Sequence, residues 1–262
     1  MVSERVARLG MENRGLLYVA FGDSYQELAV WTITHTRKFT DLPIVVLVNE
    51  PANSKWEGLE GVTVHPFELP QTANRNVKTQ MCRYTPFEET IYMDTDSVLR
   101  CGGIETLFAM MGSHDLLLNK LIHWRDVDKI PRLYRTAMKL LSSSLPIDVY
   151  NGALICWRSN SKTERFFKQW NNGWQRTGKG REMPALACAL QNAQLEVADI
   201  SGKGLFEPDF YNPDCMIQHN YNSNGKQDWF EEFNLPKLIQ HKPFDSDPRD
   251  WDMVDFNEEM RS

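Results

Sequence analysis

The sequence has few cysteines, no excess of basic residues and no long apolar run, and each absence excludes a class of protein. Its five cysteines form no C-x-x-C pair and no short zinc-type spacing, so we expect free thiols, not a disulfide framework. A net charge of −6 gives no general attraction to nucleic acid or to an anionic membrane. No stretch approaches the ~18 apolar residues needed to span a bilayer, and segment 1–15 lacks the apolar core of a secretory signal. We therefore expect a soluble, cytoplasmic protein.

The first half of the chain has the pattern of an α/β domain. Two apolar runs, Leu16–Phe21 and Ile44–Val48, are typical of strands buried on both faces. Between them, Ser24 and Glu27 match a capping box, which predicts a helix to about Lys38. Strand, helix and strand make a βαβ unit. Further runs predict strands at 62–67, 90–93, 115–118 and 153–157, and helices at 76–84, 132–141, 161 onward and 184–191. A second capping box, Ser161 to Glu164, opens the helix that begins at 161.

Asp94, Thr95 and Asp96 directly follow the apolar run Thr90–Met93. In open α/β sheets, ligands bind at the carboxyl ends of the strands, so these two acids are expected to face a site. Paired carboxylates suit a hard cation such as Mn²⁺ or Mg²⁺, which takes its other ligands from water and phosphate oxygens. The alternative interpretation is a solvated acidic strand end.

The segment TIYMDTDSVL at 90–99 resembles the D-x-D segment of the glycogenin-like retaining glycosyltransferases, which have the GT-A fold. The resemblance spans roughly residues 16–244 and rests on the order and spacing of several motifs. It implies that Phe21, Gly22 and Tyr25 receive the uracil ring of a UDP-sugar, that Lys78 contacts the donor, and that Asn151 and Gly152 line the donor-sugar pocket.

Near the carboxyl end, Gln240–Phe244 (QHKPF) resembles the family's late histidine and K-P-aromatic elements. The resemblance implies that His241 is the third metal ligand, beside Asp94 and Asp96, and that Lys242 contacts the diphosphate. The family separates these two elements by a few residues, whereas His241 abuts Lys242 here, so His219 is an alternative third ligand.

The resemblance also implies an acid near the donor sugar. Glu182 and Met183 stand where the family has an Asp-Gln pair, and methionine cannot replace the amide hydrogen bond. Asp148, Glu182 and Asp115 are the candidate catalytic acids, in that order. The implied reaction transfers a sugar, with retention of configuration, to a carbohydrate, lipid-linked or protein acceptor.

We therefore expect one GT-A (Rossmann-like) α/β domain at 15–247, with a mixed, mostly parallel sheet flanked by helices, between an extension at 1–14 and a tail at 248–262. Two other functions stay open. A haloacid-dehalogenase-type phosphatase also has an apolar strand followed by D-x-D, although there the motif opens the fold. A non-catalytic sugar-nucleotide-binding protein is the second alternative, because Met183 departs from the family pattern.

Overall fold

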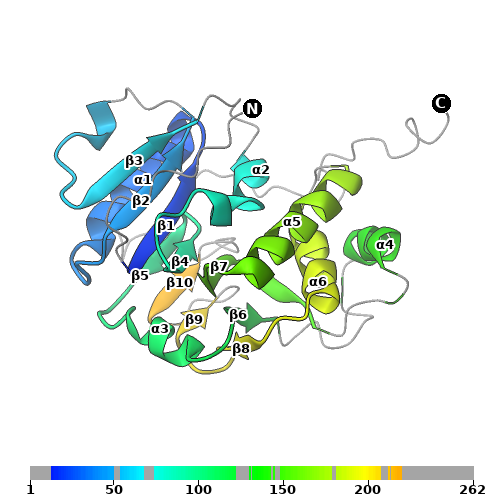
Figure 1. Ribbon diagram of the computed structural model, residues 1–262. Helices are drawn as coiled ribbons and strands as arrows, with labels where there is room; N and C mark the ends of the chain where they lie inside the picture. The colour runs from blue at the N-terminus through cyan, green and yellow to red at the C-terminus, as the bar shows by residue number, and fades with distance from the viewer. Residues whose placement is uncertain are drawn as a thin grey trace.

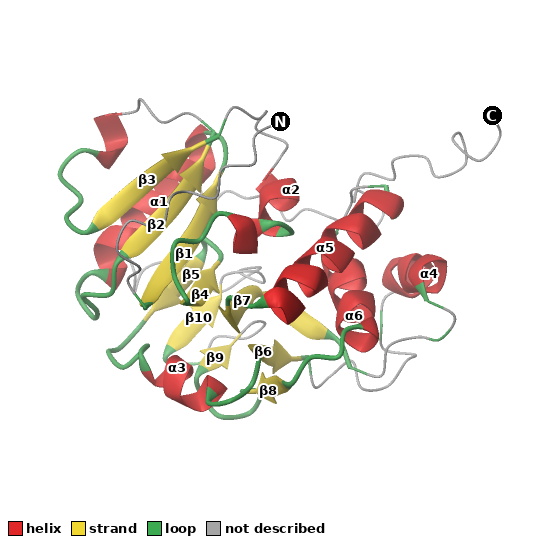
Figure 2. Ribbon diagram, viewed as in Figure 1, coloured by secondary structure: helices red, strands yellow, loops and turns green. Residues whose placement is uncertain are grey.

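The structure is a computed structural model that describes residues 13–49, 54–67, 74–121, 130, 132–142, 144, 148–178, 181–207, 212 and 214–219. A seven-stranded sheet in the order β3-β2-β1-β4-β7-β6-β8 forms its centre, and β7 is antiparallel to both of its neighbours. Its strands are β1 (Arg14–Ala20), β2 (Ile44–Val48), β3 (Val62–Pro66), β4 (Glu89–Met93), β6 (Leu116–Lys120), β7 (Tyr150–Arg158) and β8 (Val197–Asp199). The predicted mostly parallel α/β sheet flanked by helices is confirmed (Figure 2).

Helices cover both faces of the sheet (Figure 1). They are α1 (Asp23–Thr36), α2 (Asn74–Lys78), α3 (Thr106–Met111), α4 (Arg132–Leu141), α5 (Ser161–Arg176) and α6 (Met183–Asn192), with short 3₁₀ turns at Ser54–Trp56 and Met81–Arg83. Alternate residues of β1 serve the two faces: Leu16 and Tyr18 pack with α1 and α3, whereas Leu17 and Val19 pack with α5 and α6. Burial on both faces explains why the strand sequences are uninterrupted apolar runs.

A smaller sheet of three short strands stands beside the central one, in the order β5-β10-β9. Its strands are β5 (Ser97–Leu99), β9 (Phe206–Glu207) and β10 (Ile217–His219). The sequence predicted none of these three strands, nor β8. β5 and β10 are antiparallel, with His219 opposite Ser97.

Three local predictions need correction. Helix α1 begins at Asp23 and its N-cap is Gly22, without a side-chain capping bond, so the predicted Ser24 capping box is wrong. Helix α5 is capped by Asn160, whose side chain accepts from the amide nitrogens of Lys162 and Thr163, one residue earlier than predicted. The predicted helix at 76–84 is instead the short α2 followed by a 3₁₀ turn.

Strands β1, β2, β4 and β6 point the same way, so their carboxyl ends meet at one edge, here called the carboxyl edge; the opposite edge is the amino edge. Within the described residues, no helix has both the length and the apolar character needed to cross a bilayer. The domain boundaries at 14/15 and 247/248 stay predictions.

Candidate functional site

Asp94 and Asp96, here called the acidic pair, lie on the tight loop between β4 and β5, at the carboxyl edge. The amide of Asp94 donates to the carbonyl of Ala153 on β7, at 2.8 Å, and the carbonyl of Asp94 accepts from the amide of Ser97, at 2.9 Å. Thr95 is buried, and its carbonyl accepts from the Thr32 hydroxyl of α1 at 2.6 Å. These bonds fix the loop backbone, so the two carboxylates project from a rigid support.

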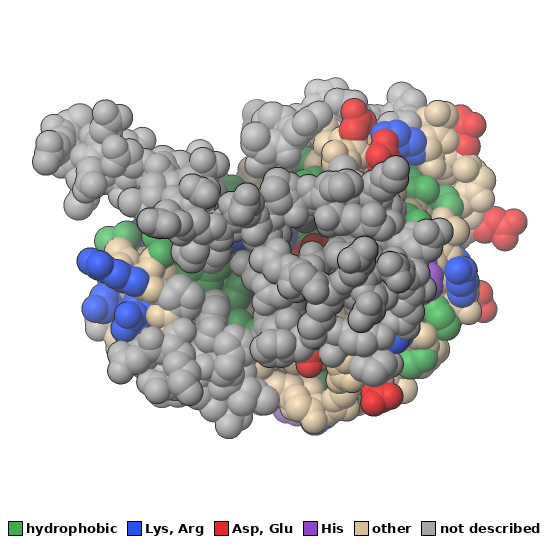
Figure 3. All heavy atoms as spheres, turned by 180° about the vertical axis from the view of Figure 1, so that it is seen from behind, with side chains coloured by type: hydrophobic (Ala, Val, Ile, Leu, Met, Phe, Trp, Pro, Cys, Tyr) green, Lys and Arg blue, Asp and Glu red, His purple; other side chains and the backbone are tan. Residues whose placement is uncertain are grey.

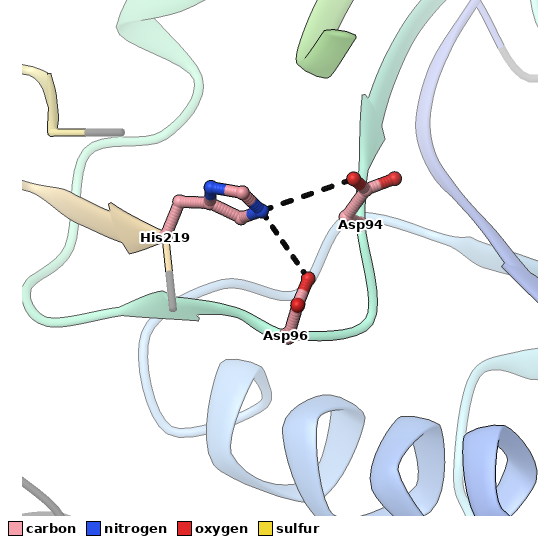
Figure 4. A group of neighbouring side chains, drawn as sticks. All are labelled: Asp94, Asp96 and His219. Atoms are coloured by element: carbon pink, nitrogen blue, oxygen red, sulfur yellow. Dashed lines mark ion pairs between the residues drawn. The ribbon is translucent and has the colours of Figure 1, made fainter. Parts of the chain in front are cut away.

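Strand β10 brings His219 to the two carboxylates (Figure 4). Its Nε2 atom lies 3.4 Å from Asp96 Oδ1 and 3.9 Å from Asp94 Oδ2. One ligand atom from each of the three residues lies within 4.8 Å of the others. Two carboxylate oxygens and one imidazole nitrogen are a suitable partial ligand set for Mn²⁺ or Mg²⁺, with positions left for water and phosphate. The residues present therefore fit a divalent cation.

Lys78 lies buried between Asp94 and Glu182, at the end of α2. Its Nζ atom donates to Asp94 Oδ1 at 2.9 Å, to Asp94 Oδ2 at 3.1 Å and to Glu182 Oε1 at 3.0 Å. Burial by itself would lower the pKa of Lys78, but the two carboxylates outweigh burial and raise it well above its ordinary value. The Tyr92 hydroxyl donates a further hydrogen bond to Asp94 Oδ1. Lys78 therefore remains an ammonium that orients both acids.

Glu182 is the residue before α6, and the start of that helix places its side chain beside Lys78. The indole of Trp170 on α5 donates to the Glu182 carbonyl at 3.0 Å, which ties α6 to α5 at this point. Arg75 Nε lies 3.3 Å from Glu182 Oε2, so Glu182 contacts two cations. Burial would raise the pKa of Glu182, yet Lys78 and Arg75 lower it to about 2. Glu182 is thus a permanent carboxylate at neutral pH.

Asn151 and Gly152 lie near the start of β7, and Gly152 is close to the Lys78 side chain. The Asn151 side chain is buried, and its Oδ1 accepts from the Ala153 amide at 2.7 Å. A Cβ atom on Gly152 would stand 3.7 Å from both Glu182 Oε1 and Lys78 Nζ. A side chain at this position would therefore lie in ordinary contact with the Lys78–Glu182 pair.

The turn after β1 also lies at the carboxyl edge. Gly22 has φ 89°, a left-handed conformation that glycine adopts without strain, and its amide donates to Asn49 Oδ1 at 2.7 Å. Tyr25 is exposed, at 36%, whereas Phe21 is buried and packs near Phe67. The predicted contact of Phe21 with a base stays a prediction, and the Phe21 ring is not exposed to receive one. Asn49, which the sequence analysis did not single out, is the polar residue that follows β2 and fixes this turn.

The two remaining predicted acids pair with other residues. Asp148 is at the carboxyl edge, with Oδ1 3.0 Å from Lys120 Nζ. Asp115 precedes β6 at the amino edge, where its carboxylate accepts from Asn160 Nδ2, Lys162 Nζ and the Glu196 amide. The structure therefore does not bring Asp115 to the acidic pair. Met183 packs against an apolar cluster that includes Met138 and Cys188.

His241 and Lys242 lie outside the described residues, so their predicted roles stay predictions. His219, the alternative third ligand, is the histidine that the described structure places beside Asp94 and Asp96. Its placement depends on the pairing of β10 with β5, which the sequence analysis did not predict.

Comparisons with known proteins identify the fold. No family model matches the sequence, and no curated protein matches it in a sequence search. Among solved structures, the galactosyltransferase LgtC in complex with donor and acceptor sugar analogs has a TM-score of 0.60 at 10% identity, covering 86% of this chain and 95% of LgtC. An active-site mutant of LgtC gives 0.60 at 9% identity, with the same coverages.

The bifunctional glycosyltransferase WbbM, in its apo form, has a TM-score of 0.58 at 9% identity and covers 88% of this chain and 50% of WbbM. At identities this low, the comparisons show that the folds are alike, but they assign no role to any residue. The structural neighbours are GT-A glycosyltransferases, and this chain has the GT-A fold.

Proposed function

We propose that the protein is a glycosyltransferase that transfers a sugar from a UDP-sugar to an acceptor hydroxyl, with a divalent cation held by Asp94, Asp96 and His219. The observation that carries the proposal is the meeting of two carboxylates and an imidazole at the carboxyl edge of a GT-A fold. This is the edge where ligands of open α/β sheets bind. A cation there supplies Lewis-acid stabilisation of the diphosphate as it leaves.

The protein's own residues hold the donor and shape the charge around its sugar. Tyr25 is an exposed ring for the base, and Gly152, which has no side chain, lies next to Glu182 where we place the donor sugar. A fixed carboxylate beside the anomeric carbon favours the positive charge that develops there as the bond to phosphate breaks. Lys78 holds this carboxylate and Asp94 at a constant separation.

The low pKa of Glu182 restricts its role. An effective general base has a pKa near the operating pH, whereas the pKa of Glu182 is about 2. Glu182 therefore acts through charge and does not take the acceptor's proton. We infer that the departing phosphate takes this proton, which places the acceptor on the face that the leaving group occupies and gives retention of configuration.

UDP release from a panel of UDP-sugars, with Mn²⁺ or with a chelator, tests the function. Metal-dependent release in wild type, lost in Asp94→Asn and His219→Ala, is the expected result. Hydrolysis of phosphomonoesters in its place would support the phosphatase alternative. Binding of UDP-sugars without turnover, with acceptors present, would support the non-catalytic alternative, which the apolar setting of Met183 favours. Loss of activity in His241→Ala with full activity in His219→Ala would assign the third ligand to His241.

A further inference from the structure

The outward face of α4 exposes two leucines. Among the described residues, three large hydrophobic side chains are exposed, and two of them are Leu133 (37%) and Leu140 (51%) on this one helix. They are seven residues apart, which is close to two full turns, so they lie on one stripe about 10 Å apart along the axis. A pair of exposed leucines aligned on one helix differs from the scattered exposed apolar residues of ordinary surfaces.

Cations flank this stripe. Arg132 and Lys139 are exposed on the same outward face, and Arg135 follows further round, half-buried. Helix α4 contains no acidic residue. Arg176 of α5 is also exposed, and its Nη2 donates to the Leu140 carbonyl at 3.3 Å. Seen from behind, blue side chains gather at the left edge of the molecule, the side on which α4 and α5 lie in that view (Figure 3). A chain of net charge −6 thus concentrates cations beside its exposed leucines.

The opposite face of α4 is sufficient to hold the helix in place. Tyr134 and Met138 are buried in an apolar cluster with Ile130, Ala187 and Cys188. The Met138 carbonyl accepts from Cys188 Sγ of α6 at 3.7 Å. Packing on α6 therefore accounts for the buried stripe, and it does not require Leu133, Leu140, Arg132 or Lys139.

We propose that the outward face of α4 docks the protein on an anionic lipid surface. Interfacial helices combine apolar residues that enter the headgroup region with Lys and Arg on the polar side, which is the arrangement of this face. Cations within a Debye length of the surface dominate the attraction, so the net negative charge of the whole chain does not prevent it. A ten-residue helix offers much less than the ~800 Å² per partner of a stable protein interface. A lipid surface requires no such matching partner.

Docking through α4 would also hold the carboxyl edge in one orientation relative to the lipid surface. This follows because α4 packs against α6, and α6 begins beside Glu182 at that edge. The face is built from residues outside the candidate site, so the inference stands independently of the glycosyl-transfer proposal.

Co-sedimentation of the full chain with phosphatidylcholine vesicles, with and without phosphatidylglycerol, tests the proposal. We expect wild type to bind the anionic vesicles, more weakly at high salt, and not the neutral ones. Arg132→Glu with Lys139→Glu should weaken binding by at least ~10-fold, because each cation near the surface contributes several-fold. Leu133→Ser with Leu140→Ser should weaken it by a similar factor, and Leu140→Ser alone by less.

The matched control is Arg165→Glu with Lys203→Glu, which reverses two exposed cations on α5 and after β8. This control should bind vesicles like wild type, and all variants should keep a melting temperature close to that of wild type. Absence of wild-type binding, or equal binding by the α4 variants, would overturn the proposal. Self-association of wild type that the same variants abolish would also overturn it, because the face would then join two copies of the chain.

Discussion

The two ends of strand β4 carry charged clusters that are built from similar residues but balanced differently. At the amino edge, Glu89 is paired with Arg14 and Arg158, and Asp115 with Lys162. At the carboxyl edge, Asp94 and Glu182 share Lys78, and Asp96 lies beside His219. Among the described residues, Lys and Arg outnumber carboxylates in the first cluster, whereas carboxylates outnumber Lys and Arg in the second, even with Arg75 included.

This difference distinguishes a structural cluster from a candidate site. The amino-edge acids have pKa values lowered by cations and hydrogen bonds that also join β4, β6, β7 and α5, so their charge is satisfied within the fold. An excess of negative charge on a rigid loop costs stability unless another cation binds. Within the described residues, the carboxyl edge therefore has the charge balance of a candidate cation site.

Removing a carboxylate should have the largest effect at the carboxyl edge. Asp94→Asn or Asp96→Asn should lower metal-dependent UDP release by ~10³-fold, because a Lewis-acid cation contributes several kcal/mol to stabilising the leaving charge. Both should also abolish the thermal shift with Mn²⁺. Asp115→Asn is the matched control at the amino edge and should keep the shift while lowering the melting temperature. An equal loss of the shift in Asp115→Asn would remove the distinction between the clusters.

Removing a lysine should destabilise the protein much more at the carboxyl edge than at the amino edge. Lys78→Met leaves the buried Glu182 and the partly buried Asp94 without their shared cation, so we expect a loss of ~3–5 kcal/mol in the free energy of unfolding. Lys162→Met removes a half-exposed partner of Asp115 and should cost ~1 kcal/mol or less. Urea denaturation measures both. Similar losses in the two variants would mean that the Lys78 network is no more tightly coupled than a surface pair.

The sequence predicted the large elements because their signals are local. Runs such as Ile44–Val48 specify a strand buried on both faces, and helix α4 was predicted with its observed bounds. Strands β5, β9 and β10 have two or three residues each, which is too short for periodicity to indicate them. They exist because they pair with one another, and such pairing is not encoded within any one of them.

The same limit applies to the site. Asp94 and Asp96 were predictable because an apolar strand ends directly before them. Lys78 and Glu182 are separated by 104 residues, so their contact required the fold. His219 was predicted only as an alternative because its approach to the acids depends on the pairing of β10 with β5. Capping at Ser24 failed because Gly22, with its positive φ, begins the turn into α1.

Gly152→Ala sharpens the comparison without altering any charge. The added methyl group would stand in ordinary contact, 3.7 Å from Lys78 Nζ and Glu182 Oε1, so we expect little change in melting temperature. It would occupy the space proposed for the donor sugar, and a misplaced methyl group costs ~10-fold or more in kcat/KM. Steady-state kinetics with the best UDP-sugar measures this. Unchanged kcat/KM would place the sugar elsewhere.

A last prediction concerns the pH dependence of stability. Lys78 and Arg75 lower the pKa of Glu182 to about 2, against about 4.3 in an unfolded chain. The folded state therefore gains stability from Glu182 above the unfolded pKa and loses it as the pH falls through the folded one. Glu182→Gln should be less stable than wild type at neutral pH, and the difference should shrink between about pH 4.3 and 2. Glu89→Gln is the amino-edge counterpart, and because Arg14 and Arg158 are more exposed than Lys78, its difference should be smaller over the same range. Unfolding free energies measured from pH 2 to neutral would decide, and a Glu182→Gln difference that stays constant with pH would mean that Glu182 stabilises the fold by packing and not by its charge.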